Sequence, residues 1–113
     1  MPPIARTPEP PYYAVIFSSV ASDDREGYAE MAAAMDTLAA EQDGYLGHES
    51  VRGDEGLGIT VSYWRDEAAI AAWREHSRHR VAQRIGRERW YEDYCLRVAK
   101  VERVTQKPLE GAG

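Results

Sequence analysis

Histidine and tryptophan side chains are the residues of this sequence best suited to chemistry, and most of them fall within residues 58–104. That stretch holds His76, His79 and all three tryptophans of the chain, Trp64 and Trp73 among them. An imidazole titrates near neutral pH and can take a proton from a phenol, while an indole offers a flat apolar surface to an aromatic ligand. We therefore take His79 as the candidate general base, with a hydrogen-bonded structural histidine as the alternative interpretation. Trp64, Trp73 and His76 are candidate binding residues, although core packing would also explain each of them.

The spacing of the two histidines also fits a metal site. His76 and His79 are three residues apart on a predicted helix, a separation that can place two ligands on one metal ion. A metal site needs further ligands, and the remaining histidine, His48, is distant in the sequence. We expect neither a metal nor a cofactor.

The charge distribution is uneven. Residues 1–56 carry 3 basic and 11 acidic side chains, for −8, and residues 57–113 carry 11 basic and 8 acidic, for +3, which sum to the net charge of −5. Six arginines fall between Arg74 and Arg89. They could attract an anionic ligand, but such a run is more typical of the solvated face of a helix. The acidic total, and the lack of a basic strand interleaved with aromatic residues, argue against a nucleic-acid partner.

Length and cysteine content set further limits. A chain of 113 residues suits a single domain, and a domain of that size can gain core from a partner chain. No apolar run reaches the roughly 20 residues that span a bilayer, and the first residues do not resemble a signal peptide. Cys95 is the only cysteine. We expect it to be a small buried apolar residue in a cytoplasmic protein with no membrane partner.

Periodicity predicts the secondary structure. Five of the six prolines lie in residues 1–11, which predicts an irregular N-terminal arm, and residues 105–113 form a loose tail. The domain between them spans residues 12–104. Its predicted strands are 12–19, 45–52, 59–64 and 91–104, and its predicted helical segments are 24–42, 66–75 and 78–86.

Local signals mark the ends of these segments. Ser22, Asp23 or Asp24 is expected to cap the first helix, and Gly44 to end it in a left-handed conformation. Asp66 is expected to cap the second helix. The string GDEGLG is read as a hairpin loop, because it is not followed by the helix that a dinucleotide-binding loop needs.

The order strand, helix, strand, strand, helix, strand predicts an α+β, ferredoxin-like βαββαβ fold. Its four-stranded antiparallel sheet carries both helices on one face. Apolar side chains also fall on the other face, where water would meet them. We therefore expect a homodimer whose two sheets pack face to face.

Four stretches carry a family resemblance: YYAVIFSS, GYAEMAAAMDTLAAEQDGYLGHES, GITVSYW and IAAWREHSRHRVAQRIGRERWYEDY. Together they resemble the antibiotic biosynthesis monooxygenase superfamily of dimeric α+β barrels, in particular a small bacterial branch of uncharacterised proteins. The resemblance covers roughly residues 12–104. It implies a pocket between the sheet and the helices of each subunit, and cofactor-independent oxygenation of phenols or quinols.

The resemblance also implies roles for single residues. Trp73 best matches the family's site tryptophan, with Trp64 as the rival, and His79 or His76 would supply the histidine. Ser18 lies near the position of the family's asparagine, but this sequence contains no asparagine. Apart from the resemblance, Tyr91 belongs to the aromatic cluster that opens the last strand. Dimer or core packing explains this cluster most simply, and Tyr91 is also a candidate pocket tyrosine.

The function expected from the sequence is that of a cofactor-independent monooxygenase acting on a small aromatic ligand. One alternative is a non-catalytic small-molecule-binding or stress-response dimer. A haem-binding or haem-degrading protein is the other, and we expect no haem degradation of the known type because the asparagine is missing.

Overall fold

The computed structural model describes residues 4–23, 27–78 and 90–108, and it contains six regular elements. In chain order these are β1 (Tyr12–Ala21), α1 (Tyr28–Ala40), β2 (Tyr45–Arg52), β3 (Leu57–Trp64), α2 (Glu67–Arg78) and β4 (Tyr91–Val101). The order confirms the predicted βαββαβ fold. The predicted segment 78–86 lies outside the described residues from position 79 onward.

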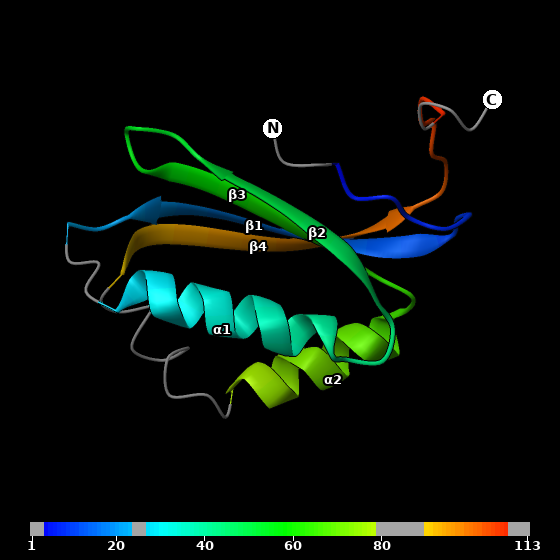
Figure 1. The fold of residues 1–113 in the computed structure, drawn as a ribbon, viewed down its shortest axis with the longest axis horizontal. Helices are drawn as coiled ribbons and strands as arrows, with labels where there is room; N and C mark the ends of the chain where they lie inside the picture. The colour runs from blue at the N-terminus through cyan, green and yellow to red at the C-terminus, as the bar shows by residue number, and fades with distance from the viewer. Residues whose placement is uncertain (1–3, 24–26, 79–89, 109–113) are drawn as a thin grey trace.

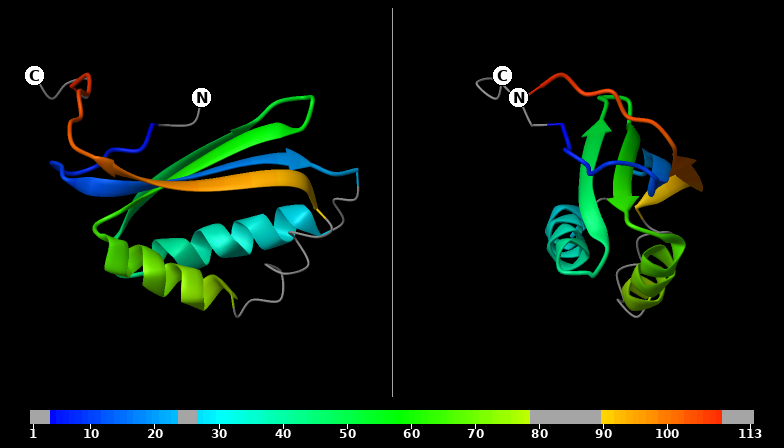
Figure 2. Two further views of the ribbon diagram at one scale, coloured as in Figure 1. Left: turned by 180° about the vertical axis from the view of Figure 1, so that it is seen from behind. Right: turned by 90° about the vertical axis from the view of Figure 1, so that its right-hand side faces the viewer.

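The four strands form one antiparallel sheet in the order β2-β3-β1-β4. Both helices lie on the same face of this sheet, and the N-terminal arm and the segment after β4 lie on the other (Figures 1 and 2). We call these the helix face and the open face. Since side chains alternate along a strand, β1 contributes Tyr13, Val15, Phe17 and Ser19 to the helix face and Tyr12, Ala14, Ile16 and Ser18 to the open face.

The core lies between the helices and the end of β3. Trp64 is 0% exposed, and Ala69 and Ile70 of α2 are buried against it. Half-buried side chains complete the cluster: Tyr13, Val15, Ala39, Tyr45 and Trp73. The large apolar side chains of α1 are half-buried, and no residue of α1 is fully buried. The core therefore depends chiefly on β3 and α2.

The helix ends partly follow the sequence signals. Gly44 adopts a φ of +89° after α1, as predicted. Asp66 accepts a hydrogen bond from the amide of Ala69 at 2.8 Å, which confirms the cap of α2. The expected cap of α1 is wrong, because α1 begins after Gly27 with no side-chain cap. Ser22 comes too early in the chain, since its amide still bonds the carbonyl of Trp90 at 2.7 Å beside the sheet.

Two peripheral features complete the fold. The hairpin loop predicted between β2 and β3 is confirmed, with Gly56 at a φ of +96°. Cys95 is exposed, so the expectation that it is buried is wrong. It lies on the open face of β4, where it pairs with Ser18 of β1. Among the described residues, no helix is long and apolar enough to cross a membrane.

Candidate functional site

A stacked row of three rings runs along the helix face. Trp64 stacks on Trp73 with ring centroids 6.0 Å apart and planes 22° apart, and Trp73 stacks on His76 at 6.0 Å and 29°. Trp64 sits at the end of β3, while Trp73 and His76 are three residues apart on α2 and share a face of that helix. The structure thus brings together three of the residues that the sequence singled out.

The His76 imidazole ends this row with an unused nitrogen. Its Nε2 atom is buried and has no hydrogen-bond partner within the described part of the chain. Buried polar atoms are normally paired, so such a nitrogen is suited to bond a ligand. Trp64 has no exposed surface, and its Nε1 already donates to the hydroxyl of Ser62 at 2.9 Å. Trp64 therefore supports the row from behind.

A tyrosine and a histidine extend the row toward the β2 edge of the sheet. The ring of Tyr45 meets Trp64 edge-on at 5.6 Å, and its hydroxyl lies 2.5 Å from Nδ1 of His48. Nε2 of His48 faces the carboxylate of Asp36 on α1 at 3.8 Å. Burial and the charge of Asp36 raise the pKa of Tyr45 above its usual value, which keeps the phenol protonated.

Tyr91 belongs to a second aromatic cluster. Its ring meets Phe17 edge-on at 5.3 Å, and its hydroxyl donates to that of Tyr28 at 3.4 Å. Burial, assisted by the bond to Tyr28, raises the pKa of Tyr91. Tyr91 pairs with Ala21 of β1, whereas Trp64 pairs with Tyr13. The two clusters are separated by eight strand positions, or about 26 Å at 3.3 Å each.

Arg52 reaches into the second cluster from the far edge of the sheet. Its guanidinium lies 5.9 Å from the ring centre of Tyr28 and 6.0 Å from that of Tyr91, and it donates to the hydroxyl of Ser19 at 2.8 Å. The side chain passes over Gly58 of β3. A Cβ at position 58 would lie 2.6 Å from Cζ of Arg52, so Arg52 can take this path because position 58 has no side chain.

The remaining candidate residues lie elsewhere. Ser18 falls on the open face, between Phe17 and Ser19, whose side chains both contact helix-face residues. The structure therefore does not bring Ser18 together with the stacked row. His79, the candidate base, lies outside the described residues, three positions after His76.

Apolar side chains of β4 remain exposed on the helix face. Tyr94, Leu96 and Val98 pair with Ser19, Phe17 and Val15 of β1 and point to the side where the helices lie. They are 42%, 48% and 40% exposed. This β4 strip offers an apolar surface on the same side of the sheet as His76.

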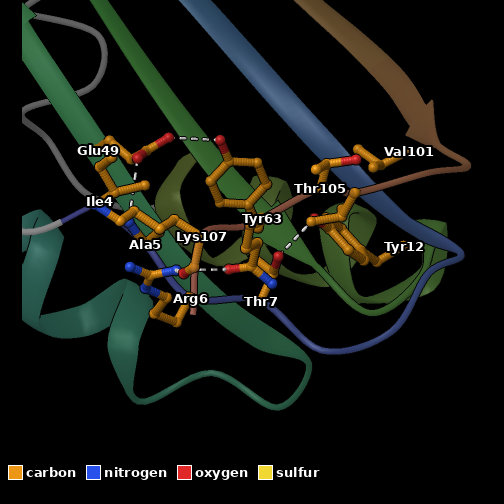
Figure 3. A pocket seen from close by; sticks show the side chains of 12 residues that line it. Ile4, Ala5, Arg6, Thr7, Tyr12, Glu49, Tyr63, Val101, Thr105 and Lys107 are labelled. Carbon is orange, nitrogen blue, oxygen red and sulfur yellow. Dashed lines mark hydrogen bonds between the residues drawn. The ribbon is translucent and has the colours of Figure 1, made fainter. Parts of the chain in front are cut away.

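A groove of about 420 Å³ lies on the opposite side, where the N-terminal arm crosses the open face (Figure 3). The amide of Ala5 donates to Oε2 of Glu49 at 3.1 Å, and the hydroxyl of Tyr63 donates to Oε1 of the same carboxylate at 2.6 Å. The hydroxyls of Thr7 and Tyr12 lie 2.6 Å apart. These bonds hold the arm against the sheet, so residues 4–7 are irregular but ordered by contacts.

The sequence pattern of the antibiotic biosynthesis monooxygenase family matches residues 11–85. The chain belongs to this family. The fold agrees with this membership, because the structure of a putative antibiotic biosynthesis monooxygenase from Nitrosomonas europaea aligns with a TM-score of 0.64 and 13% identity over 90% of this chain and 93% of that one.

Individual relatives range from close to distant. An uncharacterized protein of Bacillus subtilis, YqjZ, is 58% identical over 100 residues, which cover 88% of each chain. The jasmonate monooxygenase ABM of Pyricularia oryzae is 33% identical over 94 residues, which cover 79% of this chain and 43% of that enzyme. The structure of SnoaB, a cofactor-independent oxygenase from Streptomyces nogalater, aligns with a TM-score of 0.68 and 11% identity over 89% of this chain and 99% of that one.

Within residues 4–23, 27–78 and 90–108, no group of three or more histidine, cysteine or acidic side chains is close enough to hold a metal ion. His76 and His48 belong to separate parts of the helix face, since His48 is engaged by Tyr45 and Asp36.

Sequence reasoning missed several residues of this family member's helix face. Tyr45, His48 and Asp36 come together because α1 packs against β2, a contact between elements that sequence spacing does not encode. Arg52 was missed because its side chain crosses a neighbouring strand. Gly58 was the available signal, since a glycine inside a strand often marks a close approach.

We predict that Tyr63 ionises late. Burial, followed by its hydrogen bond to Glu49, raises the pKa of Tyr63 from 10.0 to about 12. Because the folded pKa exceeds the unfolded one, the stability from the protonated phenol is present below pH 10 and is lost as the pH rises through about 12. In Glu49→Gln the partner charge is gone, so the pKa of Tyr63 should fall toward 10.0. Ultraviolet titration of phenolate measures both values. The Tyr63→Phe variant shows which part of the titration belongs to Tyr63. Identical titrations of the parent and Glu49→Gln would contradict the prediction.

Proposed function

We propose that this chain is a cofactor-independent monooxygenase that oxidises a small phenol or quinol on the helix face of its sheet. The observation that carries the proposal is the stacked row of Trp64, Trp73 and His76, which ends in a buried Nε2 atom with no hydrogen-bond partner among the described residues. An aromatic wall beside a desolvated hydrogen-bonding nitrogen suits a flat substrate with a hydroxyl group. SnoaB is a cofactor-independent oxygenase and the Pyricularia relative is a jasmonate monooxygenase, and both activities support oxygenation as the class of reaction.

The proposed chemistry needs a base and a dry surface. A quinol becomes a strong reductant when it loses its proton, and the anion can then pass electrons to O₂ directly. One oxygen atom enters the substrate, and the other leaves as water with two hydrogen atoms from the substrate. His79 is the proposed base, and His76 is proposed to bond the substrate oxygen. Exclusion of water strengthens both interactions.

The β4 strip completes the proposed binding surface. Tyr94, Leu96 and Val98 give the substrate an apolar floor on the side that α2 faces. Trp73 provides the flat wall, because it is half-buried whereas Trp64 is sealed behind it. We therefore propose that substrate contacts Trp73, with Trp64 holding Trp73 in place.

Oxygen consumption with a panel of quinols tests the proposal. The parent protein is expected to consume O₂ above the rate of quinol autoxidation. His79→Ala should slow consumption at least about tenfold, because general base catalysis typically contributes more than that. His76→Phe should also slow consumption, because the substrate oxygen would lose its proposed hydrogen bond to Nε2. Tyr63→Phe is the matched control, since Tyr63 lies on the open face, and it should retain the parent rate.

Oxygen consumption, together with a fluorescence and a haem assay, separates the competing functions. If quinols quench the tryptophan fluorescence of the parent protein but no O₂ is consumed, the protein is a binding module. If both histidine variants consume O₂ at the parent rate, His76 and His79 have no role in the mechanism. Release of iron from added haem in the presence of a reductant would instead identify a haem-degrading protein.

We also propose that two copies pair through their open faces. Val51, Leu57 and Ile59 lie there at 72%, 57% and 40% exposure, a degree of apolar exposure that a second sheet would cover. Sedimentation is expected to give twice the chain mass of 12.7 kDa. Val51→Asp should shift the protein toward 12.7 kDa, because a charge would enter the interface. A parent protein that sediments at 12.7 kDa would refute the pairing.

A further inference from the structure

We propose that Trp73, Trp64 and Tyr45 form a chain that carries oxidising equivalents away from the oxygen-reactive surface, with His48 as the proton acceptor at its end. The function would be protective, since radicals that escape productive chemistry would be drawn to a defined tyrosine. The source of the oxidant rests on the proposed monooxygenase function. The conducting chain itself is a separate property of the fold and can be tested by itself.

The three rings are in continuous contact. Trp73 and Trp64 stack at 6.0 Å, and Trp64 meets Tyr45 at 5.6 Å. One-electron transfer between neighbouring aromatic side chains is fast at contact distance. The middle ring, Trp64, is 0% exposed, so a radical passing through it would be shielded from solvent.

Tyr45 has the partner that a redox-active tyrosine needs. Oxidation of a phenol makes its hydroxyl strongly acidic, so the electron leaves readily when a base takes the proton at the same time. Nδ1 of His48 lies 2.5 Å from the Tyr45 hydroxyl. The other nitrogen, Nε2, faces the Asp36 carboxylate at 3.8 Å, which favours a proton on Nε2 and leaves Nδ1 free to accept.

Electrons and protons balance in the proposed transfer along the three rings. A one-electron oxidant derived from O₂ or from the substrate takes an electron from Trp73, which regains one from Trp64. Trp64 takes an electron from Tyr45, whose proton moves to His48. The products are the reduced oxidant, a neutral tyrosyl radical and an imidazolium that Asp36 stabilises. A small thiolate then reduces the radical, becoming a thiyl radical, and His48 returns the proton.

The series of rings leads from the proposed substrate surface toward the edge of the sheet. Its inner end is Trp73, which also stacks on His76 beside the proposed substrate surface. Its outer end, Tyr45, lies on β2, an edge strand of the sheet, and is half-buried. The side chains of the neighbouring His48 on β2 and Asp36 on α1 are 32% and 59% exposed. A reductant in solution can therefore reach the last member without entering the substrate surface.

Tyr63 provides a comparison within the same protein. Its hydroxyl also has a proton acceptor, Glu49, at 2.6 Å. Its ring lies on the open face and meets Tyr12 at 5.9 Å, whereas the chain from Trp73 runs along the helix face. Tyr63 thus has a proton acceptor but no contact with the series Trp73, Trp64 and Tyr45. Tyr63→Phe is therefore the matched control for Tyr45→Phe.

Laser flash–quench experiments can inject the oxidant beside Trp73. The protein would carry Cys95→Ser and Ala72→Cys, with a thiol-reactive ruthenium polypyridyl attached next to Trp73 on an exposed position of α2. After the flash, transient absorption should show a tryptophanyl radical that decays as a tyrosyl radical grows. The label supplies the oxidant, so the result does not depend on any oxygenase activity.

The variants decide the assignment. Tyr45→Phe should abolish the tyrosyl signal and prolong the tryptophanyl radical, while Tyr63→Phe should behave as the parent. His48→Gln should slow tyrosyl growth at least about tenfold, because the amide cannot take up the proton. Circular dichroism confirms that each variant is folded, and Tyr45→Phe keeps the ring that packs on Trp64. Absence of a tyrosyl radical in the parent, or its persistence in Tyr45→Phe, would overturn the proposal.

Discussion

Trp64→Ala is expected to lower the free energy of unfolding by about 3–5 kcal/mol, the usual cost of truncating a buried aromatic residue. Trp64 is 0% exposed and contacts both Trp73 and Tyr45. The loss would leave a cavity at the centre of the core, between β3 and α2. Small domains have total stabilities of about 5–15 kcal/mol, so a measurable fraction of this variant should be unfolded in water.

Urea unfolding of the purified variants measures this effect. Leu96→Ala is the matched control, because Leu96 is also a large apolar residue of the sheet but is 48% exposed. It should cost no more than about 1 kcal/mol, since half of its side chain already meets water. Equal losses in the two variants would show that the cluster around Trp64 is not the main core.

Gly44→Ala is expected to cost about 2–5 kcal/mol for two reasons that add. The backbone at Gly44 has a φ of +89°, which strains any residue with a Cβ. An added Cβ would also lie 2.6 Å from Cβ of Ala69, a buried residue of α2 that cannot rotate away. The substitution should therefore push apart the junction where α1 ends and α2 begins.

Gly53→Ala is the control for Gly44→Ala. A Cβ at Gly53 would meet its nearest atom, the carbonyl oxygen of Leu57, at 3.8 Å, an ordinary contact. Its unfolding free energy should stay within about 0.5 kcal/mol of the parent value. Adding Ala69→Gly to Gly44→Ala should restore part of the loss by removing the clash. If it restores nothing, backbone strain alone explains the cost.

The fold could be predicted because its signals are local. The period-two pattern of Ile59, Val61 and Tyr63 against Ser62 and Trp64 assigns their faces correctly, as the register with β1 shows. The helical spacing of Ala69, Ile70 and Trp73 identifies the side of α2 that packs on the core. Gly44 and Asp66 mark helix ends through conformations and hydrogen bonds that involve near neighbours in the chain.

The site was less predictable because it depends on how the elements pack. Trp73 and His76 adjoin on one helix, so their pairing follows from spacing. The pairing of Tyr45, His48 and Asp36 depends on where α1 lies over β2. Ser18 fell on the open face because one position along β1 reverses the direction of a side chain. The exposure of Cys95 depends on whether a second layer covers β4, which its own sequence does not state.

Because the side chain of Arg52 crosses Gly58, we expect substitutions at these two positions to be coupled. A side chain at 58 would occupy the space within 2.6 Å of Cζ of Arg52, so it would force the arginine out and leave Ser19, Tyr28 and Tyr91 without their cation. Relatives that keep an arginine at 52 should therefore keep glycine at 58, and those that lose one should be free to lose the other. Such covariation would be detectable in an alignment of sequences, and it would indicate the contact of Arg52 on β2 with Ser19, Tyr28 and Tyr91.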